Sequence, residues 1–341
     1  HETVSATRAG EEFTLVIPDH ANLVADPADV FASLGYAREE LDMGHAHDAT
    51  TGVVQPAELE EGGFVANAGW PEYAVHEGQL PEGVGNTWIH EYVHTRQNFS
   101  TTEEADWLFE ASAEYEAALL TLQHGNATWL AFQNHVTSDR YADANLRTRT
   151  HAGTPYADYT KGAAVMAVID ARIRNATDGR RSIETVLARL NERRQPVTSA
   201  AFKLTVAEVA GESMADEIDR LVTEPIDPDP PTNPFLYTTG PDADNDRDGL
   251  RTSEERAAGS HPFQPDTDGD GVFDGNEVEQ GTDPSVPNTA TPETAAPTDG
   301  ADETPATETT PGGDGAVGLP AIAAGVLVLG LAVRFRRRYF P

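Results

Sequence analysis

The sequence contains no cysteine and only two lysines, Lys161 and Lys203, among its 341 residues. The absence of cysteine excludes disulfides and thiolate metal sites, so any metal must be held by histidine and carboxylate side chains. Basic residues are scarce as well, with 23 Lys plus Arg against 57 Asp plus Glu and a formal net charge of -34. Because no basic stripe is available to meet phosphates, we expect no nucleic-acid partner.

Acidic residues dominate the composition. At low ionic strength so much like charge opposes compaction, whereas concentrated salt screens the repulsion. The composition is similar to that of proteins from salt-loving archaea, which implies a halophilic protein. Since the chain starts at His1 without an initiator methionine or an apolar leader, we also expect a processed product or a fragment.

Residues 1–225 are expected to form the folded body, which is large enough for one substantial core. The pattern predicts a short strand at 13–17, a helix at 27–41 after an Asp26 cap, and an irregular stretch at 42–83 with a strand or two. Helical periodicity then dominates. The helices are expected near 85–97, 103–123, 127–136, 158–174, 181–193, 199–209 and 213–222.

A linker at 226–241 leads to a tandem repeat at 242–284, whose two copies are 22 residues apart. Each copy places oxygens at loop positions 1, 3, 5 and 12 and glycine at position 6, the arrangement that a calcium loop needs. Two acidic turns in an acidic protein are the alternative, but the shared spacing favours binding, and the copies resemble thrombospondin type 3 repeats. A dockerin, which also duplicates a calcium loop, is a further alternative. The expected calcium ligands are Asp244, Asp246, Asp248, Glu255, Asp266, Asp268, Asp270, Asp274 and Glu277.

The C-terminal part has three segments of different composition. Residues 285–315 are rich in Thr, Pro, Glu and Asp, which predicts a disordered stalk. Residues 316–333 form an uncharged, mostly apolar run that is long enough for a transmembrane helix, and the basic segment 334–341 favours a cytoplasmic C-terminus. We therefore expect a single-pass protein of the cell membrane whose N-terminal domain is extracellular. Sequons at Asn98, Asn126 and Asn175 then predict a glycoprotein.

The most specific short motif is His90-Glu91-Tyr92-Val93-His94. Helical residues four apart project from one face, so both imidazoles can bind one zinc ion while Glu91 reaches a water on that metal. Glu110 and Glu114 share a face of the next predicted helix by the same spacing. One of these carboxylates can bind zinc while the other orients a histidine, although such a pair is also typical of a solvated acidic face.

The motif occurs together with Trp107-Leu108-Phe109-Glu110, with Tyr159-Thr160-Lys161-Gly162 and with the helical segment that follows. In combination, over residues 84–223, these segments resemble the gluzincin metallopeptidases. The glycyl aminopeptidase family is the nearest resemblance, and the thermolysin-like domain of alanyl aminopeptidases is a more distant one. The resemblance implies an α+β, mainly α-helical, thermolysin-like catalytic domain. The roles it implies are zinc ligands for His90, His94 and Glu110, the general base for Glu91, an oxyanion donor for Tyr159, and a partner of a ligating histidine for Glu114.

The chain departs from the alanyl type in one segment. Those relatives hold the substrate amine with Gly-Ala-Met-Glu-Asn, whereas this chain has Gly63-Phe64-Val65-Ala66-Asn67, with no glutamate at the matching place. We therefore expect a cell-surface zinc metallopeptidase that hydrolyses peptides or proteins, with aminopeptidase or endopeptidase action left open. The alternative is a non-catalytic, calcium-stiffened surface or adhesion protein that retains a peptidase scaffold.

Overall fold

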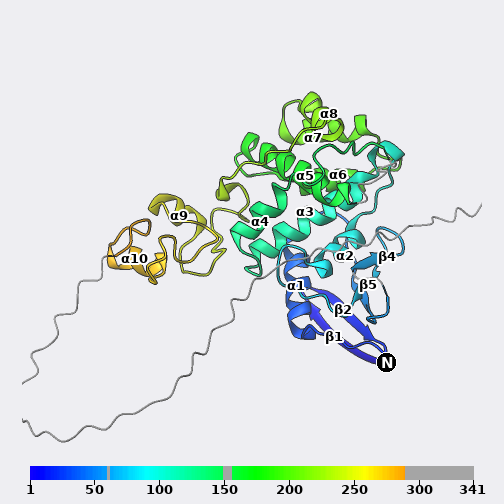
Figure 1. The fold of residues 1–341 in the computed structure, drawn as a ribbon, viewed down its shortest axis with the longest axis horizontal. Coiled ribbons are helices and arrows are strands. Elements are labelled where there is room, and N and C mark those ends of the chain that lie inside the picture. Colours follow the sequence, from blue (N-terminus) through cyan, green and yellow to red (C-terminus); the bar gives the residue numbers. More distant parts are fainter. Residues whose placement is uncertain (60–61, 149–155, 289–341) are drawn as a thin grey trace, which may run out of the picture.

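The computed structural model describes residues 1–59, 62–148 and 156–288. These residues form a mixed fold of helices and one small sheet (Figure 1), in agreement with the α+β prediction. Within these ranges no helix combines the length and the apolar character needed to cross a membrane. The predicted transmembrane helix at 316–333, the basic tail at 334–341 and the stalk from residue 289 onward lie outside the described residues.

A five-stranded sheet occupies the lower part of the body in Figure 1, with the order β1-β2-β3-β5-β4. β2, β3 and β5 run parallel in the centre, and the two edge strands are antiparallel to their neighbours. The predicted strand at 13–17 is confirmed, while the first strand was not predicted and the irregular stretch holds three strands. The strands are β1 (Glu2–Arg8), β2 (Glu11–Ile17), β3 (Ala49–Gln55), β4 (Gly63–Val65) and β5 (Glu72–His76).

Eight α-helices of the body match the predicted ones closely. Side-chain caps define several starts: Asp26 accepts a hydrogen bond from Ala28 N, and Asn86 accepts one from Ile89 N. The helices are α1 (Pro27–Glu40), α2 (Thr87–Arg96), α3 (Trp107–Gln123), α4 (Trp129–Val136), α5 (Ala157–Ala176), α6 (Ile183–Asn191), α7 (Ser199–Ala210) and α8 (Ala215–Thr223).

The helix predicted at 103–123 is wrong in one respect, because it is two elements. A 3₁₀ turn, η1 (Glu103–Ala105), precedes α3, which begins only at Trp107. Asp106, between them, has helical backbone angles and accepts a hydrogen bond from the Thr101 hydroxyl. The consequence is that Glu110 lies in the first turn of α3.

The body is layered, with α2 between the sheet and α3 (Figure 1). α3 in turn packs along α5, and most side chains of both helices are buried. Gly162 of α5 permits this close approach, since a Cβ atom there would lie 2.7 Å from the Ala111 Cβ of α3. The fold therefore brings three helices, α2, α3 and α5, to one place in the core.

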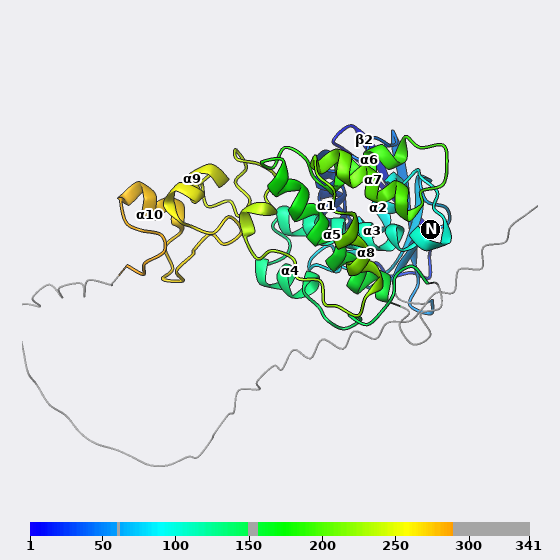
Figure 2. The same ribbon diagram turned by 90° about the horizontal axis from the view of Figure 1, so that it is seen from above.

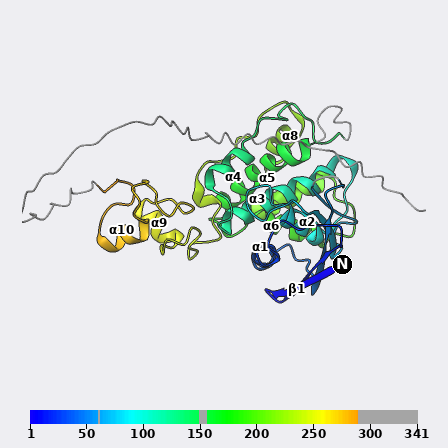
Figure 3. The same cartoon turned by 60° about the horizontal axis from the view of Figure 1, so that its bottom comes forward.

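The C-terminal repeats form a smaller module at the side of the body, beyond α4 (Figures 2 and 3). A 3₁₀ turn, η2 (Pro234–Leu236), leads into it, and it contains α9 (Thr252–Ala258) and α10 (Asp274–Gln280). The two repeats contact each other directly, because Gly275 N donates to Asp248 Oδ2 at 3.1 Å. They therefore form one unit.

Candidate metal centre

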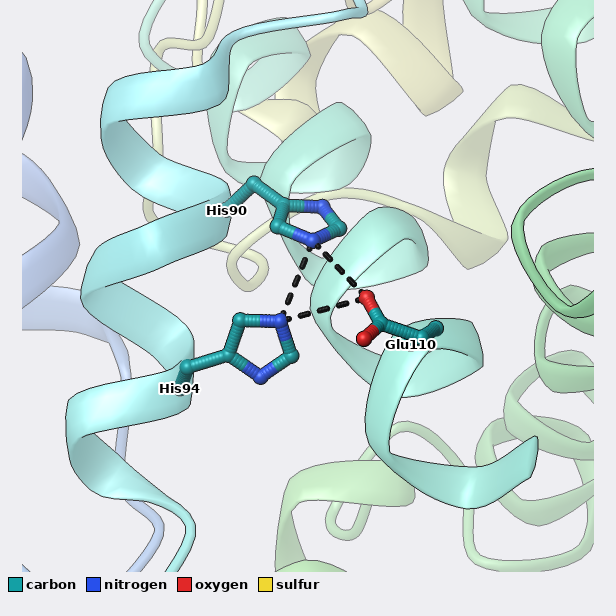
Figure 4. Close-up of side chains that lie close together, drawn as sticks. All are labelled: His90, His94 and Glu110. Carbon is teal, nitrogen blue, oxygen red and sulfur yellow. Dashed lines mark hydrogen bonds and ion pairs between the residues drawn. The ribbon is translucent and has the colours of Figure 1, made fainter. Parts of the chain in front are cut away.

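Three side chains from α2 and α3 point toward one another (Figure 4). His90 Nε2 lies 3.1 Å from His94 Nε2, and Glu110 Oε2 lies 3.3 Å from each of these nitrogens. Four tetrahedral ligands at zinc distances of about 2.0–2.2 Å lie roughly 3.3–3.6 Å apart. The two imidazoles and the carboxylate therefore fit a zinc ion in both chemistry and spacing.

The protonation of this cluster also suits a cation. Burial works to lower the pKa of His90 and His94, but Glu110, with Glu91 and, at His90, Glu114, outweighs it and raises the pKa of both rings. Burial works to raise the pKa of Glu110, and the two histidines outweigh it and hold that pKa well below its usual range. The cluster thus keeps an ionised carboxylate and attracts positive charge, which a divalent ion supplies while displacing protons.

Each histidine is oriented through its other ring nitrogen. His90 Nδ1 lies 2.9 Å from Glu114 Oε2, and His94 Nδ1 lies 2.7 Å from Gln97 Oε1. Both Nε2 atoms therefore face the shared centre, as ligation of a metal requires. Glu114 is thus placed beside His90 rather than beside the other ligands.

Gln97 was not singled out from the sequence. It is fully buried, and its amide nitrogen donates to Phe109 O and to Ser112 Oγ, both at 2.9 Å, which leaves its carbonyl for His94. The only signal in the sequence was its position three residues after His94, at the end of the same helix.

Glu114 is held as a carboxylate. Burial alone would raise its pKa, but the adjacent His135 and His90 rings outweigh that effect and lower the pKa to about 2. The Glu114 carboxylate is therefore a strong acceptor for the His90 ring.

Glu91 points into the same region and is almost fully buried, at 4% exposure. Its Oε2 has no hydrogen-bond partner among the described residues. Burial raises the pKa of Glu91 to about 7, although His90 and His94 work to lower it. A carboxylate with a pKa near neutrality suits a group that takes up and releases a proton.

The edge strand β4 lies directly against Glu91. A Cβ atom on Gly63 would lie 2.6 Å from Glu91 Cγ and 2.8 Å from the carbonyl oxygen of Ala74. Only glycine fits this position without a shift of the backbone, so β4 limits the space around the Glu91 carboxyl group.

Tyr159, in the first turn of α5, stacks on His90 with ring centres 5.6 Å apart and planes inclined by 7°. Burial, the Glu110 charge and a hydrogen bond to Glu110 raise the pKa of Tyr159. The phenol therefore stays protonated and can act as a hydrogen-bond donor beside His90, His94 and Glu110.

The two repeat loops also gather carboxylates. Oxygens of Asp244, Asp246 and Asp248 lie within 4.8 Å of one another, and so do those of Asp266, Asp268 and Asp270. The loops are therefore formed around two separate acidic centres, one for each repeat.

Glu255, Asp274 and Glu277, the other expected calcium ligands, differ in whether their carboxyl oxygens already accept hydrogen bonds. Glu255 is buried, and neither carboxyl oxygen has a hydrogen-bond partner among the described residues. Burial, together with the charges of the loop aspartates, raises the pKa of Glu255 to about 8. Asp274 instead accepts hydrogen bonds from Thr267, and Glu277 Oε1 accepts one from Asn288. Asp274 thus bonds within its own loop.

Structural neighbours are M1 zinc metallopeptidases and an aminopeptidase N family protein, and the bacterial TSP3 repeat model matches residues 266–287. No curated protein sequence matches significantly.

The aminopeptidase N family protein from Idiomarina loihiensis has a TM-score of 0.52 at 14% identity, over 65% of this chain and 46% of its own. Two M1 zinc metallopeptidase structures from Deinococcus radiodurans, one a variant bound to a Tyr-Ser-Ala substrate, have TM-scores of 0.49 and 0.45. Both are 14% identical, over 67% of this chain and 54% of theirs. The chain thus spans about half the length of these neighbours. The Idiomarina match shows a similarity of fold. The thermolysin-like assignment and the nearer resemblance to the glycyl aminopeptidase family stay predictions.

Proposed function

We propose that this chain is a zinc-dependent peptidase whose ion is held by His90, His94 and Glu110. The observation that carries the proposal is the spacing of 3.1–3.3 Å between their three ligand atoms. Glu114 and Gln97 contact the Nδ1 atoms of the two histidines, so that both Nε2 atoms face the same point. Glu91 and Tyr159 lie beside this cluster, so a base and a hydrogen-bond donor are present with the ligands. The fold similarity to the Idiomarina protein supports the same class of enzyme.

Bound zinc supplies Lewis acidity, which polarises a peptide carbonyl and makes a water molecule more acidic. Glu91 takes the proton of the attacking water, whose oxygen forms the new bond to the carbonyl carbon. Glu91 then returns that proton to the leaving amine as the C–N bond breaks. Its buried Oε2, which has no competing hydrogen bond among the described residues, suits it to this transfer.

Tyr159 donates a hydrogen bond from its hydroxyl to the oxygen that becomes negatively charged as the carbonyl carbon turns tetrahedral. Because its pKa is raised, the Tyr159 hydroxyl keeps its proton at neutral pH. Its stacking on His90 fixes the ring beside the metal ligands.

We further propose that the substrate is a peptide. Its N-terminal amine is not bound by a glutamate such as the one that alanyl aminopeptidases use. The segment Gly63–Asn67 has no glutamate, and Gly63 lies against Glu91. Cleavage of peptides with free and with acetylated N-termini separates the two modes. Aminopeptidase action requires the free amine, whereas endopeptidase action tolerates the blocked one.

The cellular setting is also a proposal, and it is supported by sequence. The apolar run 316–333 and the arginines after it favour a membrane anchor with the peptidase outside a salt-adapted cell. The acidic loops and the TSP3 repeat match support calcium as a second metal.

The variant Glu91→Gln tests the reaction. It keeps the size of the side chain and leaves the three ligands in place, so we expect unchanged zinc stoichiometry and a fall in kcat of about 10² to 10⁴-fold. Glu39→Gln, which removes the same charge from an exposed position of α1, is the matched control and should keep full activity. The proposal fails if the wild-type protein, in high salt with zinc and calcium, holds no zinc and cleaves no peptide.

A further inference from the structure

α4 lies between the repeat module and the metal centre, and its two ends contact different parts of the molecule. Trp129 is its first residue, and His135 lies six residues later. At 1.5 Å per residue these positions are roughly 9 Å apart along the helix axis. A movement of one end is therefore transmitted to the other by a rigid element of little more than two turns.

The His135 end reaches the metal centre. His135 Nε2 lies 3.2 Å from Glu114 Oε1, while the other oxygen of the same carboxylate lies 2.9 Å from His90 Nδ1. Glu114 thus has one oxygen against each histidine. Without His135 the carboxylate could rotate, and the contact that turns His90 Nε2 toward the metal would loosen.

The Trp129 end contacts the module. Its indole stacks on Phe263 with ring centres 5.8 Å apart and planes inclined by 6°. The centre of the His261 ring lies 5.7 Å from the centre of the Trp129 ring. His261 N donates to Thr267 Oγ1 at 2.8 Å, and Thr267 in turn donates to the Asp274 carboxylate. The second repeat loop is therefore linked to α4 by ring contacts and hydrogen bonds.

The first repeat loop contacts the body independently. Arg247, whose φ of 64° is uncommon for a side-chain-bearing residue, donates from Nη2 to His124 O at 3.0 Å, at the C-terminal end of α3. α3 carries both Glu110 and Glu114. The two loops thus meet the two helices that supply these carboxylates and His135.

We propose that His135 is a positioning residue of the zinc site, and that calcium binding to the repeat module strengthens zinc binding through α4. His135 is not one of the three clustered ligand residues, and it acts through Glu114 on His90. Calcium orders the second repeat loop, which is linked to Trp129 through His261 and Phe263, so that α4 presents His135 in one place. This inference rests on the proposed function.

The experiment measures zinc affinity directly. Metal-free full-length protein in high salt is reconstituted with zinc alone or with zinc plus calcium, and the zinc Kd is measured by competition with a chromogenic chelator. The variants are His135→Ala and His135→Gln, whose amide nitrogen can take the place of Nε2 beside Glu114 Oε1. Asn134→Ala, an exposed neighbour on the same helix, is the matched control.

We expect His135→Ala to weaken zinc binding by about tenfold, the lower end for loss of an outer partner of a ligand. His135→Gln should recover most of that loss, and Asn134→Ala should match the wild type. Calcium should tighten zinc binding in the wild type and in Asn134→Ala but not in His135→Ala. Thermal melting of each variant verifies that it is folded.

Trp129→Leu provides a second variant that leaves His135 in place. It should bind zinc as the calcium-free wild type does and lose the calcium effect. Equal zinc affinity of His135→Ala and the wild type, or a Gln variant as weak as the Ala variant, overturns the role of His135. An equal calcium effect with and without His135 overturns the link through α4. If the wild type binds no zinc at all, it is the proposed function that fails.

Discussion

Gly162→Ala tests the close contact of the two helices that carry Glu110 and Tyr159. The added methyl carbon would lie 2.7 Å from Ala111 Cβ, whereas carbon atoms pack best at about 3.5–4.0 Å. α3 and α5 must therefore separate by about 1 Å. Overpacking of this kind costs about 1–3 kcal/mol, and the better helix propensity of alanine returns about 1 kcal/mol. We expect a net loss of up to about 2 kcal/mol, or roughly 4–8 °C in Tm.

The same shift should affect activity more than stability. Tyr159 lies three residues before Gly162, so separation of the helices moves its hydroxyl away from the ligands on α2 and α3. A displacement of about 1 Å at a reacting group can cost up to about 10²-fold in rate. We therefore expect a fall in kcat of at least about tenfold, measured on a peptide substrate in high salt with zinc.

The exchange of the two side chains supplies the control. In Ala111→Gly/Gly162→Ala the methyl group moves from one helix to the other, so the overlap is relieved and kcat should largely recover. A double-mutant cycle should give a coupling energy of about 1–3 kcal/mol between the two sites. If Gly162→Ala is as stable and as active as the wild type, and the cycle shows no coupling, the interpretation of this contact is wrong.

Two further predictions concern stability. Burial and the charges of Glu184 and Asp170 raise the pKa of Glu116 well above 4.5, and neither oxygen has a hydrogen-bond partner among the described residues. Above about pH 4.5 the folded state therefore keeps a proton that the unfolded chain releases, so the protein loses stability as the pH rises. Glutamine does not ionise, so Glu116→Gln avoids this loss. The variant should raise the urea midpoint more at about pH 8 than at about pH 5. Equal shifts at both values would contradict this sign. Calcium at about a hundredfold above its Kd should add about 2.7 kcal/mol and raise the Tm by roughly 5–10 °C, with magnesium as the control. An unchanged Tm would rule out the calcium loops.

Local signals account for how well the helices were predicted. Thr198 caps the start of α7 and Gly211, with a φ of 81°, ends it, and both residues are visible in the sequence. β1 could not be found in this way, because its sequence ETVSATR is mostly polar and mostly exposed. It exists as a strand through its pairing with β2, which is a tertiary contact.

At the metal centre, too, local spacing could be predicted from the sequence and tertiary contacts could not. Helical spacing alone predicts that His90 and His94 share a face, and their rings do lie together with centres 4.8 Å apart. The approach of His135 to Glu114 depends on how α4 packs against α3, and no pattern within either helix encodes it. A repeat motif likewise gives the loop geometry but not the surface on which Trp129 meets Phe263.

The two lysines show how sparingly this chain uses ammonium groups. Lys161 is almost fully buried, and its Nζ donates to the carbonyl oxygens of Ala142, Ala144 and Glu224 at 2.7–2.8 Å, which uses all three of its N–H bonds. Lys203 pairs with Asp219. An amine-reactive reagent can therefore modify Lys161 only when the loop at 142–144 and the end of α8 come apart. The rate at which Lys161 is modified would therefore report local opening of the fold. Because the chain has only one other lysine, this rate can be measured with little interference from other side-chain amines.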